Sequence, residues 1–182
     1  MFVRLGYEAT TTKAIADRAE VSERLIYSNF GTKEDLFREA VVSPFDQLID
    51  HYVAAWADSP ANASVDTLMT VFVRGFFELA HRNRALLLSC VTGDDPGRDR
   101  PQRIIVNRFA TAVQSMREAA IAQRGPHGLR SFDARATIAA SAGMVLSVAL
   151  LDDLLFPEGY ERPSIEELIA EMVTMICHGI VE

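Results

Sequence analysis

Two short helices near the N-terminus, separated by a break of only a few residues, constrain the fold of this chain more than any other feature. Thr11 is well suited to cap the first helix, because its hydroxyl can accept a hydrogen bond from a free backbone amide. After a short break at 19–21, Ser22 is expected to cap a second helix over 23–29 in the same way. The spacing therefore predicts a pair of helices joined by a tight turn.

The second of these helices has one apolar side and one polar side. Ile26 and Phe30 lie four residues apart and point one way, whereas Arg24 and Ser28 point the opposite way. Two helices joined by a turn of about three or four residues, the second with a polar outer face, form a helix-turn-helix, whose second helix enters the major groove of DNA. The segment therefore predicts double-stranded DNA as a partner.

The stretch from Gly6 to Leu36 resembles the DNA-binding segment of TetR-type transcriptional regulators. The resemblance is specific up to about residue 40, and beyond it extends only to an architecture. It implies an all-α protein, with a helix-turn-helix DNA-binding domain over 1–42 and a helical effector-binding and dimerisation domain over 43–182. The matching residues are Gly6, Tyr7, Thr10, Thr11, Ile15, Ala16, Ala19, Val21, Ser22, Tyr27, Phe30, Lys33 and Leu36.

The resemblance also indicates which side chains would contact DNA. It implies phosphate contacts for Tyr27 and Lys33, for which a half-buried core ring and a plain surface lysine are the alternatives. Arg24 could reach a guanine edge and Leu25 a thymine methyl group, but a solvated cation and a packing contact carry equal weight. For Thr11 we favour capping alone over a phosphate contact. The predicted DNA-binding set is Thr11, Ser22, Arg24, Leu25, Tyr27, Ser28 and Lys33.

The chain departs from the family pattern inside the motif and before it. Glu20 and Arg24 stand where glycine is common, and Leu25 stands where a small polar residue is common. Residues 1–5 supply only the end of the longer first helix that TetR-like proteins carry. We therefore expect either an internal gene start or a native chain with a longer N-terminus.

The charge of the chain is unusual for a protein that binds nucleic acid. The formal net charge is −7, and residues 1–42 hold six Lys and Arg against seven Asp and Glu. Non-specific binding to phosphates should therefore be weak, because only cations that face the duplex would contribute.

Beyond the motif, apolar residues recur at helical spacing, and no strand pattern or repeat interrupts them. Pro44 lacks a backbone donor and is expected to kink or break the helix that contains it, although Ser43 and Pro44 could equally be the cap and first position of a new helix. Turn residues predict loops at 58–62, 92–100 and 125–128, and Ser164 with Glu167 has the form of a capping box. The predicted helices cover about 33–56, 64–81, 85–91, 101–123, 134–156 and 165–179.

The last two predicted helices are candidates for a dimer interface. Small side chains at Ala136, Ala140, Gly143 and Ser147 form a stripe that would let another helix approach closely, and the last helix has a wide apolar face. We expect them to form a four-helix bundle with a second copy, mostly from the resemblance. The alternative is that they only close their own core.

Aromatic and methionine side chains of the second domain are suited to an adaptable apolar cavity. At helical spacing the same residues could form an ordinary core, and the two interpretations carry equal weight. The predicted ligand-binding set is Trp56, Phe72, Phe76, Phe109, Met116 and Met144.

Signatures of other functional classes are missing from the sequence. It contains no phosphate-binding loop, dinucleotide fingerprint, nucleophile elbow or zinc-protease motif, and its four histidines lack ligand spacing, so we expect no cofactor, no metal and no catalytic residue. Cys90 and Cys177 lack CxxC spacing and fit reduced thiols in the cytoplasm better than redox sensors. The longest uncharged run, 136–151, is shorter than the roughly 20 residues of a membrane span.

These observations favour a homodimeric, ligand-responsive regulator that a small apolar effector releases from a palindromic operator, most simply as a repressor. A helical dimer that senses a ligand or partner but has lost DNA binding is the main alternative, which the short start and the acidic motif support. A small-molecule carrier or an enzyme is the weakest interpretation.

Overall fold

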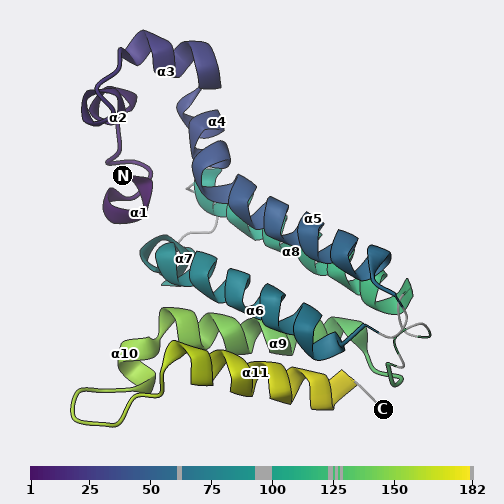
Figure 1. Cartoon of the computed structure of the whole chain (residues 1–182). Helices are drawn as coiled ribbons and strands as arrows, with labels where there is room; N and C mark the ends of the chain where they lie inside the picture. The colour runs from purple at the N-terminus through teal and green to yellow at the C-terminus, as the bar shows by residue number, and fades with distance from the viewer. Residues whose placement is uncertain (61–62, 93–99, 123–124, 126, 128, 181–182) are drawn as a thin grey trace.

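The computed structural model describes residues 1–60, 63–92, 100–122, 125, 127 and 129–180. Figure 1 shows helices throughout, with the N-terminal helices at one end and a layered bundle behind them. This confirms the all-α prediction. The helices are α1 (Phe2–Leu5), α2 (Thr12–Arg18), α3 (Glu23–Phe30), α4 (Lys33–Phe37), the π-helix η1 (Arg38–Val42), α5 (Ser43–Asp58), α6 (Val65–Arg82), α7 (Arg84–Thr92), α8 (Arg100–Ala122), α9 (Ala134–Leu150), α10 (Asp152–Leu155) and α11 (Ile165–Ile180).

The capping residues predicted from the sequence begin their helices as expected. The Thr11 hydroxyl accepts a hydrogen bond from the Ala14 amide at 3.1 Å, and the Ser22 hydroxyl accepts one from the Leu25 amide at 3.2 Å. Helix α11 begins with the predicted capping box, in which the Ser164 amide donates to Glu167 Oε2 at 2.8 Å. Local hydrogen bonding thus fixes where these helices start.

The turn between α2 and α3 is a Schellman motif with an unfavourable residue in it. The Val21 amide donates to the Ala16 carbonyl at 3.0 Å and the Glu20 amide to the Asp17 carbonyl at 3.3 Å. This closure requires left-handed backbone, and Glu20 adopts it with φ 56°. A side chain in this conformation costs about 1–2 kcal/mol relative to glycine.

Glu20→Gly is therefore expected to raise the free energy of unfolding by about 0.5–1 kcal/mol, because glycine removes the backbone strain but loses more entropy on folding. Urea unfolding would measure it. Glu20→Ala is the control, since alanine also removes the charge but keeps the strain. Equal stability of the two variants would contradict this explanation.

Helices α4, η1 and α5 follow one another without a loop, so the chain does not break at Pro44, which instead lies at the start of a helix. The Ser43 amide donates to the Arg38 carbonyl, five residues back, and the chain widens into a π-helical turn just before the proline. Pro44 then lies in the first turn of α5, directly after this π-helical turn. The helical connection between the two predicted domains is therefore continuous (Figure 1).

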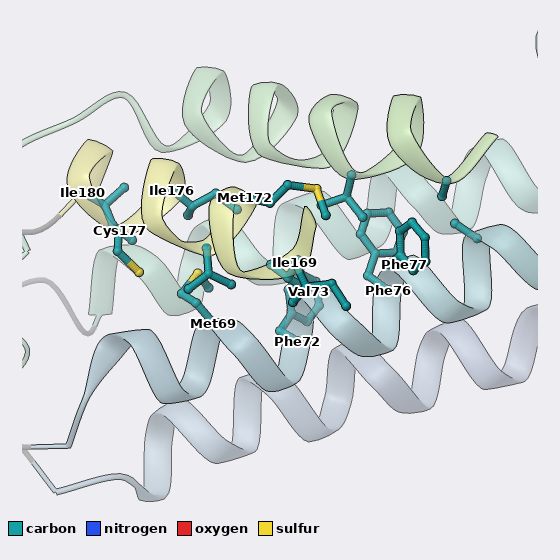
Figure 2. Packing of buried hydrophobic residues seen from close by; sticks show 14 of the residues in the cluster. Met69, Phe72, Val73, Phe76, Phe77, Ile169, Met172, Ile176, Cys177 and Ile180 are labelled. Atoms are coloured by element: carbon teal, nitrogen blue, oxygen red, sulfur yellow. The ribbon is translucent and has the colours of Figure 1, made fainter. Parts of the chain in front are cut away.

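Helix α6 is the centre of the bundle and packs against α5, α9 and α11, while α8 lies along α5 and α9. Figure 2 shows the contact between α6 and α11, where Met69, Val73 and Phe77 meet Ile169, Met172 and Ile176. Burial raises the pKa of the Cys177 thiol on this face to about 12, which keeps it unreactive at neutral pH. The side chain of Cys90 lies outside the described residues.

The predicted single helix over 134–156 is wrong, because α9 ends at Leu150 and the separate turn α10 follows. Asp152, only 4% exposed, begins that turn and bonds Arg84 at 3.1 Å and Arg162 at 2.9 Å. Burial disfavours the charged carboxylate, but the two guanidinium groups outweigh it and lower the pKa of Asp152. These long-range ion pairs end the helix where periodicity alone would continue it.

The outer face of α9 carries the predicted small-residue stripe. Ala136, Ala140 and Gly143 are exposed and Ser147 is half-buried. On α11, Met175 is 58% exposed. The predicted loop at 92–100 lies mostly outside the described residues.

Candidate nucleic-acid interface and ligand cavity

Helix α3 is two-sided in the way that the sequence predicts. Ile26 is only 8% exposed and belongs to the core of the N-terminal helices. Arg24 and Ser28 are exposed, and Leu25 and Tyr27 are 46% and 49% exposed. Leu25 is therefore only partly covered by the rest of the chain. Four predicted DNA-contacting side chains therefore lie on the open face of α3, at one end of the molecule (Figure 1).

The two predicted cap residues have a hydroxyl hydrogen left for a ligand. Thr11 and Ser22 are exposed, and each hydroxyl oxygen is used as an acceptor by a backbone amide. A hydroxyl can donate its hydrogen while its oxygen accepts, so capping and a phosphate contact are compatible.

Tyr27 belongs to a side-chain network that joins α3 to α2. Its hydroxyl oxygen lies 3.2 Å from the hydroxyl oxygen of Thr12, which is buried. Thr12 in turn donates to Glu23 Oε1 at 2.6 Å. Sequence reasoning missed Thr12 and Glu23, because their contact depends on how the two helices cross.

Lys33, at the start of α4, is held beside the loop before α2. Its ammonium nitrogen lies 4.2 Å from the centre of the Tyr7 ring and 3.5 Å from the Glu8 carbonyl oxygen. A cation over an aromatic ring is attracted by the electron-rich face. The charge of Lys33 is therefore fixed in place rather than free to swing in solvent.

The short helix α1 is anchored by aromatic contacts. The rings of Phe2 and Tyr7 both meet Phe37 edge to face, with centroid distances of 5.2 and 5.3 Å. Phe37 is fully buried, and Leu86 of α7 joins the same cluster. The N-terminal helices thus pack directly on the bundle.

A cavity of about 360 Å³ lies within the bundle, between α5, α6, α8 and α9. Trp56, Phe72, Phe76, Phe109 and Met116 line it, as the sequence predicts for a ligand site. Met144 does not line it and instead packs against the core. A mostly apolar wall of this size suits a small apolar molecule.

The cavity also has polar lining groups that sequence reasoning missed. Tyr52 lies 4.2 Å from the Phe72 ring, and burial raises the pKa of its hydroxyl, which stays protonated at neutral pH. Asp46 and Arg108 form an ion pair at 3.5 Å on the same wall and remain partly exposed. The position of Tyr52, one helical turn before Trp56, was the available signal.

The cavity wall and the core of the N-terminal helices share residues. Val41 and Val42 of η1 and Leu86 of α7 line the cavity and also belong to the cluster that holds Ile26 and Phe37. A molecule in the cavity would therefore touch the side chains on which the helix-turn-helix rests.

The described residues contain no group of three or more His, Cys, Asp or Glu side chains that could hold a metal ion. Within the same part of the chain, each helix is too short or too polar to cross a membrane.

Comparisons with known proteins point to one family. Residues 1–40 match the model of a family described as "Bacterial regulatory proteins, tetR family". A curated relative, the HTH-type transcriptional regulator YvkB of Bacillus subtilis, is 51% identical over 43 residues. That match spans 24% of this chain and 22% of the relative.

Solved structures extend the likeness to the whole fold. A Mesorhizobium loti protein assigned to the TetR family matches with a TM-score of 0.67 and 19% identity, over 100% of this chain and 91% of that one. PfmR of Thermus thermophilus matches with a TM-score of 0.62 and 19% identity, over 97% and 92%. AibR, solved with isovaleryl coenzyme A and operator DNA, matches with a TM-score of 0.60 and 18% identity, over 96% and 90%.

Proposed function

We propose, from the premise that this chain belongs to the TetR family, that it is a DNA-binding transcriptional regulator whose operator affinity a small effector controls. The observation that carries the proposal is the open face of α3, where Arg24, Leu25, Tyr27 and Ser28 are all exposed at one end of the molecule. A helix with such a face fits the major groove of DNA. The protein would act in the cytoplasm, and the domains would divide near residues 42 and 43.

Each DNA-contacting residue has a role in this proposal. Arg24 and Leu25 would reach base edges, since guanidinium groups pair with guanine and apolar side chains contact the thymine methyl group. Tyr27, Lys33 and the two cap hydroxyls would contact phosphates, which position the helix without reading sequence. Ser28, whose hydroxyl donates to the Leu25 carbonyl at 3.0 Å, would have to release that bond to contact a phosphate.

The effector would be a small, largely apolar molecule in the 360 Å³ cavity. Trp56, Phe72, Phe76, Phe109 and Met116 would contact its apolar body, and the Tyr52 hydroxyl or the Arg108 side chain could bind one polar group. AibR, a neighbour in fold, was solved with both an acyl coenzyme A and DNA. The lining of the present cavity supports an apolar ligand, and Met144 would act only by packing behind it.

Coupling would run through the residues that the cavity shares with the N-terminal core. A ligand against Val41, Val42 and Leu86 would shift the side chains under α2, α3 and α4. It changes DNA binding only if it binds the non-binding arrangement more tightly than the binding one. Repression relieved by the effector is the simplest mode.

A second copy would dock on α9 and α11. The exposed small residues of α9 permit close approach of another helix, and Met175 adds an exposed apolar contact. Two-fold symmetry would then place two α3 helices on a palindromic operator, with half-sites about one helical turn, or a multiple of it, apart.

The test is fluorescence anisotropy with DNA from upstream of the protein's own gene, at two salt concentrations. Lys33→Ala should weaken binding to all sequences alike and reduce the salt slope by about one for each protomer, whereas Arg24→Ala should change sequence preference. Thermal melts would show whether losing the contact between Lys33 and Tyr7 also affects folding.

The main alternative, a dimer that has lost DNA binding, makes the opposite prediction. It requires that no sequence gives a specific complex with a measurable salt slope, although the protein is folded and dimeric. Unchanged affinity and preference in Arg24→Ala would remove only the base-reading role of that residue.

A further inference from the structure

In the hydrogen bond between Thr12 and Tyr27, the donor and the acceptor can be assigned. Thr12 has one hydroxyl hydrogen, and the 2.6 Å contact shows it donated to Glu23 Oε1. An ionised carboxylate only accepts hydrogen bonds, so that hydrogen is not free for Tyr27. In the 3.2 Å contact Tyr27 must therefore be the donor and Thr12 the acceptor.

Tyr27 also has a single hydrogen, and the two possible acceptors compete for it. A phosphate oxygen accepts and never donates, so a phosphate contact from Tyr27 requires that hydrogen. In the free protein it is directed at Thr12, which is buried beneath α3. Contact with DNA would break the bond between Tyr27 and Thr12, or force Thr12 to leave Glu23.

We infer that Glu23 and Thr12 act as a latch that limits operator affinity by holding the Tyr27 hydrogen away from the DNA backbone. The inference rests on the proposed function and adds two positioning residues. Thr12 contacts the Tyr27 hydroxyl directly, and Glu23 acts on Tyr27 through the Thr12 hydroxyl. Glu23 lies at the first position of α3, and the hydrogen bond from Thr12 holds its carboxylate close to Tyr27.

Thr12→Val tests the latch, because valine has a similar shape and changes no charge. Without the Thr12 hydroxyl, the Tyr27 hydrogen has no acceptor inside the protein and is available for a phosphate. Operator affinity should therefore rise about three- to tenfold for each protomer, the change in affinity that corresponds to one typical net hydrogen bond. The salt slope should stay as in the parent protein, since the number of charged contacts is unchanged. In Tyr27→Phe the same Thr12→Val change should give no gain.

Glu23→Gln gives a second, independent measurement. Its amide can donate a hydrogen bond to the Thr12 oxygen, so that Thr12 can donate its own hydrogen to the Tyr27 oxygen. The Tyr27 hydrogen is then available for a phosphate. Glu20→Gln is the matched control, since it removes one carboxylate from the exposed turn next to α3. The gain from Glu23→Gln should exceed that from Glu20→Gln, and the excess should disappear in the Tyr27→Phe background.

The outcomes separate this inference from the proposed function. If the parent protein binds no DNA, the proposed function fails and the latch with it. If the parent binds and Tyr27→Phe weakens it, but Thr12→Val leaves affinity unchanged or lowers it, the latch alone is wrong and Thr12 orients Tyr27 productively. Circular dichroism melts of each variant confirm that folded proteins are compared.

Discussion

Gly143→Arg is expected to convert the protein into monomers and to lower its operator affinity by about 100-fold or more, because linked half-sites gain factors of this size from simultaneous binding. Gly143 is exposed on α9, and a Cβ atom added there would meet open space. Replacing a helical glycine also favours the helix by up to about 1 kcal/mol. The folded protomer should therefore tolerate the change, whereas a second α9 could not approach past a charged side chain.

Sedimentation over a range of protein concentrations would give the mass, and anisotropy would give the affinity for full and half operators. Ala54→Arg is the matched control, because Ala54 is exposed on α5, away from α9 and α11. It should remain dimeric and bind normally. A Gly143→Arg protein that stays dimeric would place the interface elsewhere.

Features that a few neighbouring residues determine were predictable from the sequence. The caps at Thr11 and Ser22 and the box at Ser164 depend on hydrogen bonds that span three residues, so the helix starts could be found. Features set by distant residues could not be found. Asp152, just after the end of α9, forms ion pairs with Arg84 and Arg162, which lie elsewhere in the sequence.

The same distinction between local and long-range causes applies to the candidate sites. Helical spacing brought Trp56 and Phe72 to the inner side of the bundle, where the cavity is, whereas Phe109 lines the cavity but is 40% exposed. Met144 satisfies the same pattern but lies behind the wall, because side-chain packing between helices decides which inward residues meet empty space. The bond from Thr12 to Glu23 likewise depends on the crossing of α2 and α3, which the sequence alone does not give.

The second large effect is expected from filling the cavity. Ala112 lines it from α8, and Ala112→Phe would place a ring where we propose that the effector binds. If an occupied cavity disfavours DNA binding, this variant should behave as if permanently bound to effector. Operator affinity should fall about tenfold, within the range of typical allosteric coupling. The added apolar contacts should at the same time maintain or raise the melting temperature.

Ala110→Phe is the control for Ala112→Phe, because Ala110 is exposed on the same helix and does not line the cavity. It should bind DNA like the parent protein. Ala142→Val, which adds a smaller side chain from α9, should lower affinity to a lesser degree and guards against overpacking by the phenyl ring. Two well-folded cavity variants with the parent affinity would mean that Val41, Val42 and Leu86 do not transmit occupancy of the cavity, although they contact both sites. The route from cavity to α3 would then have to run through the spacing of two protomers in the proposed dimer.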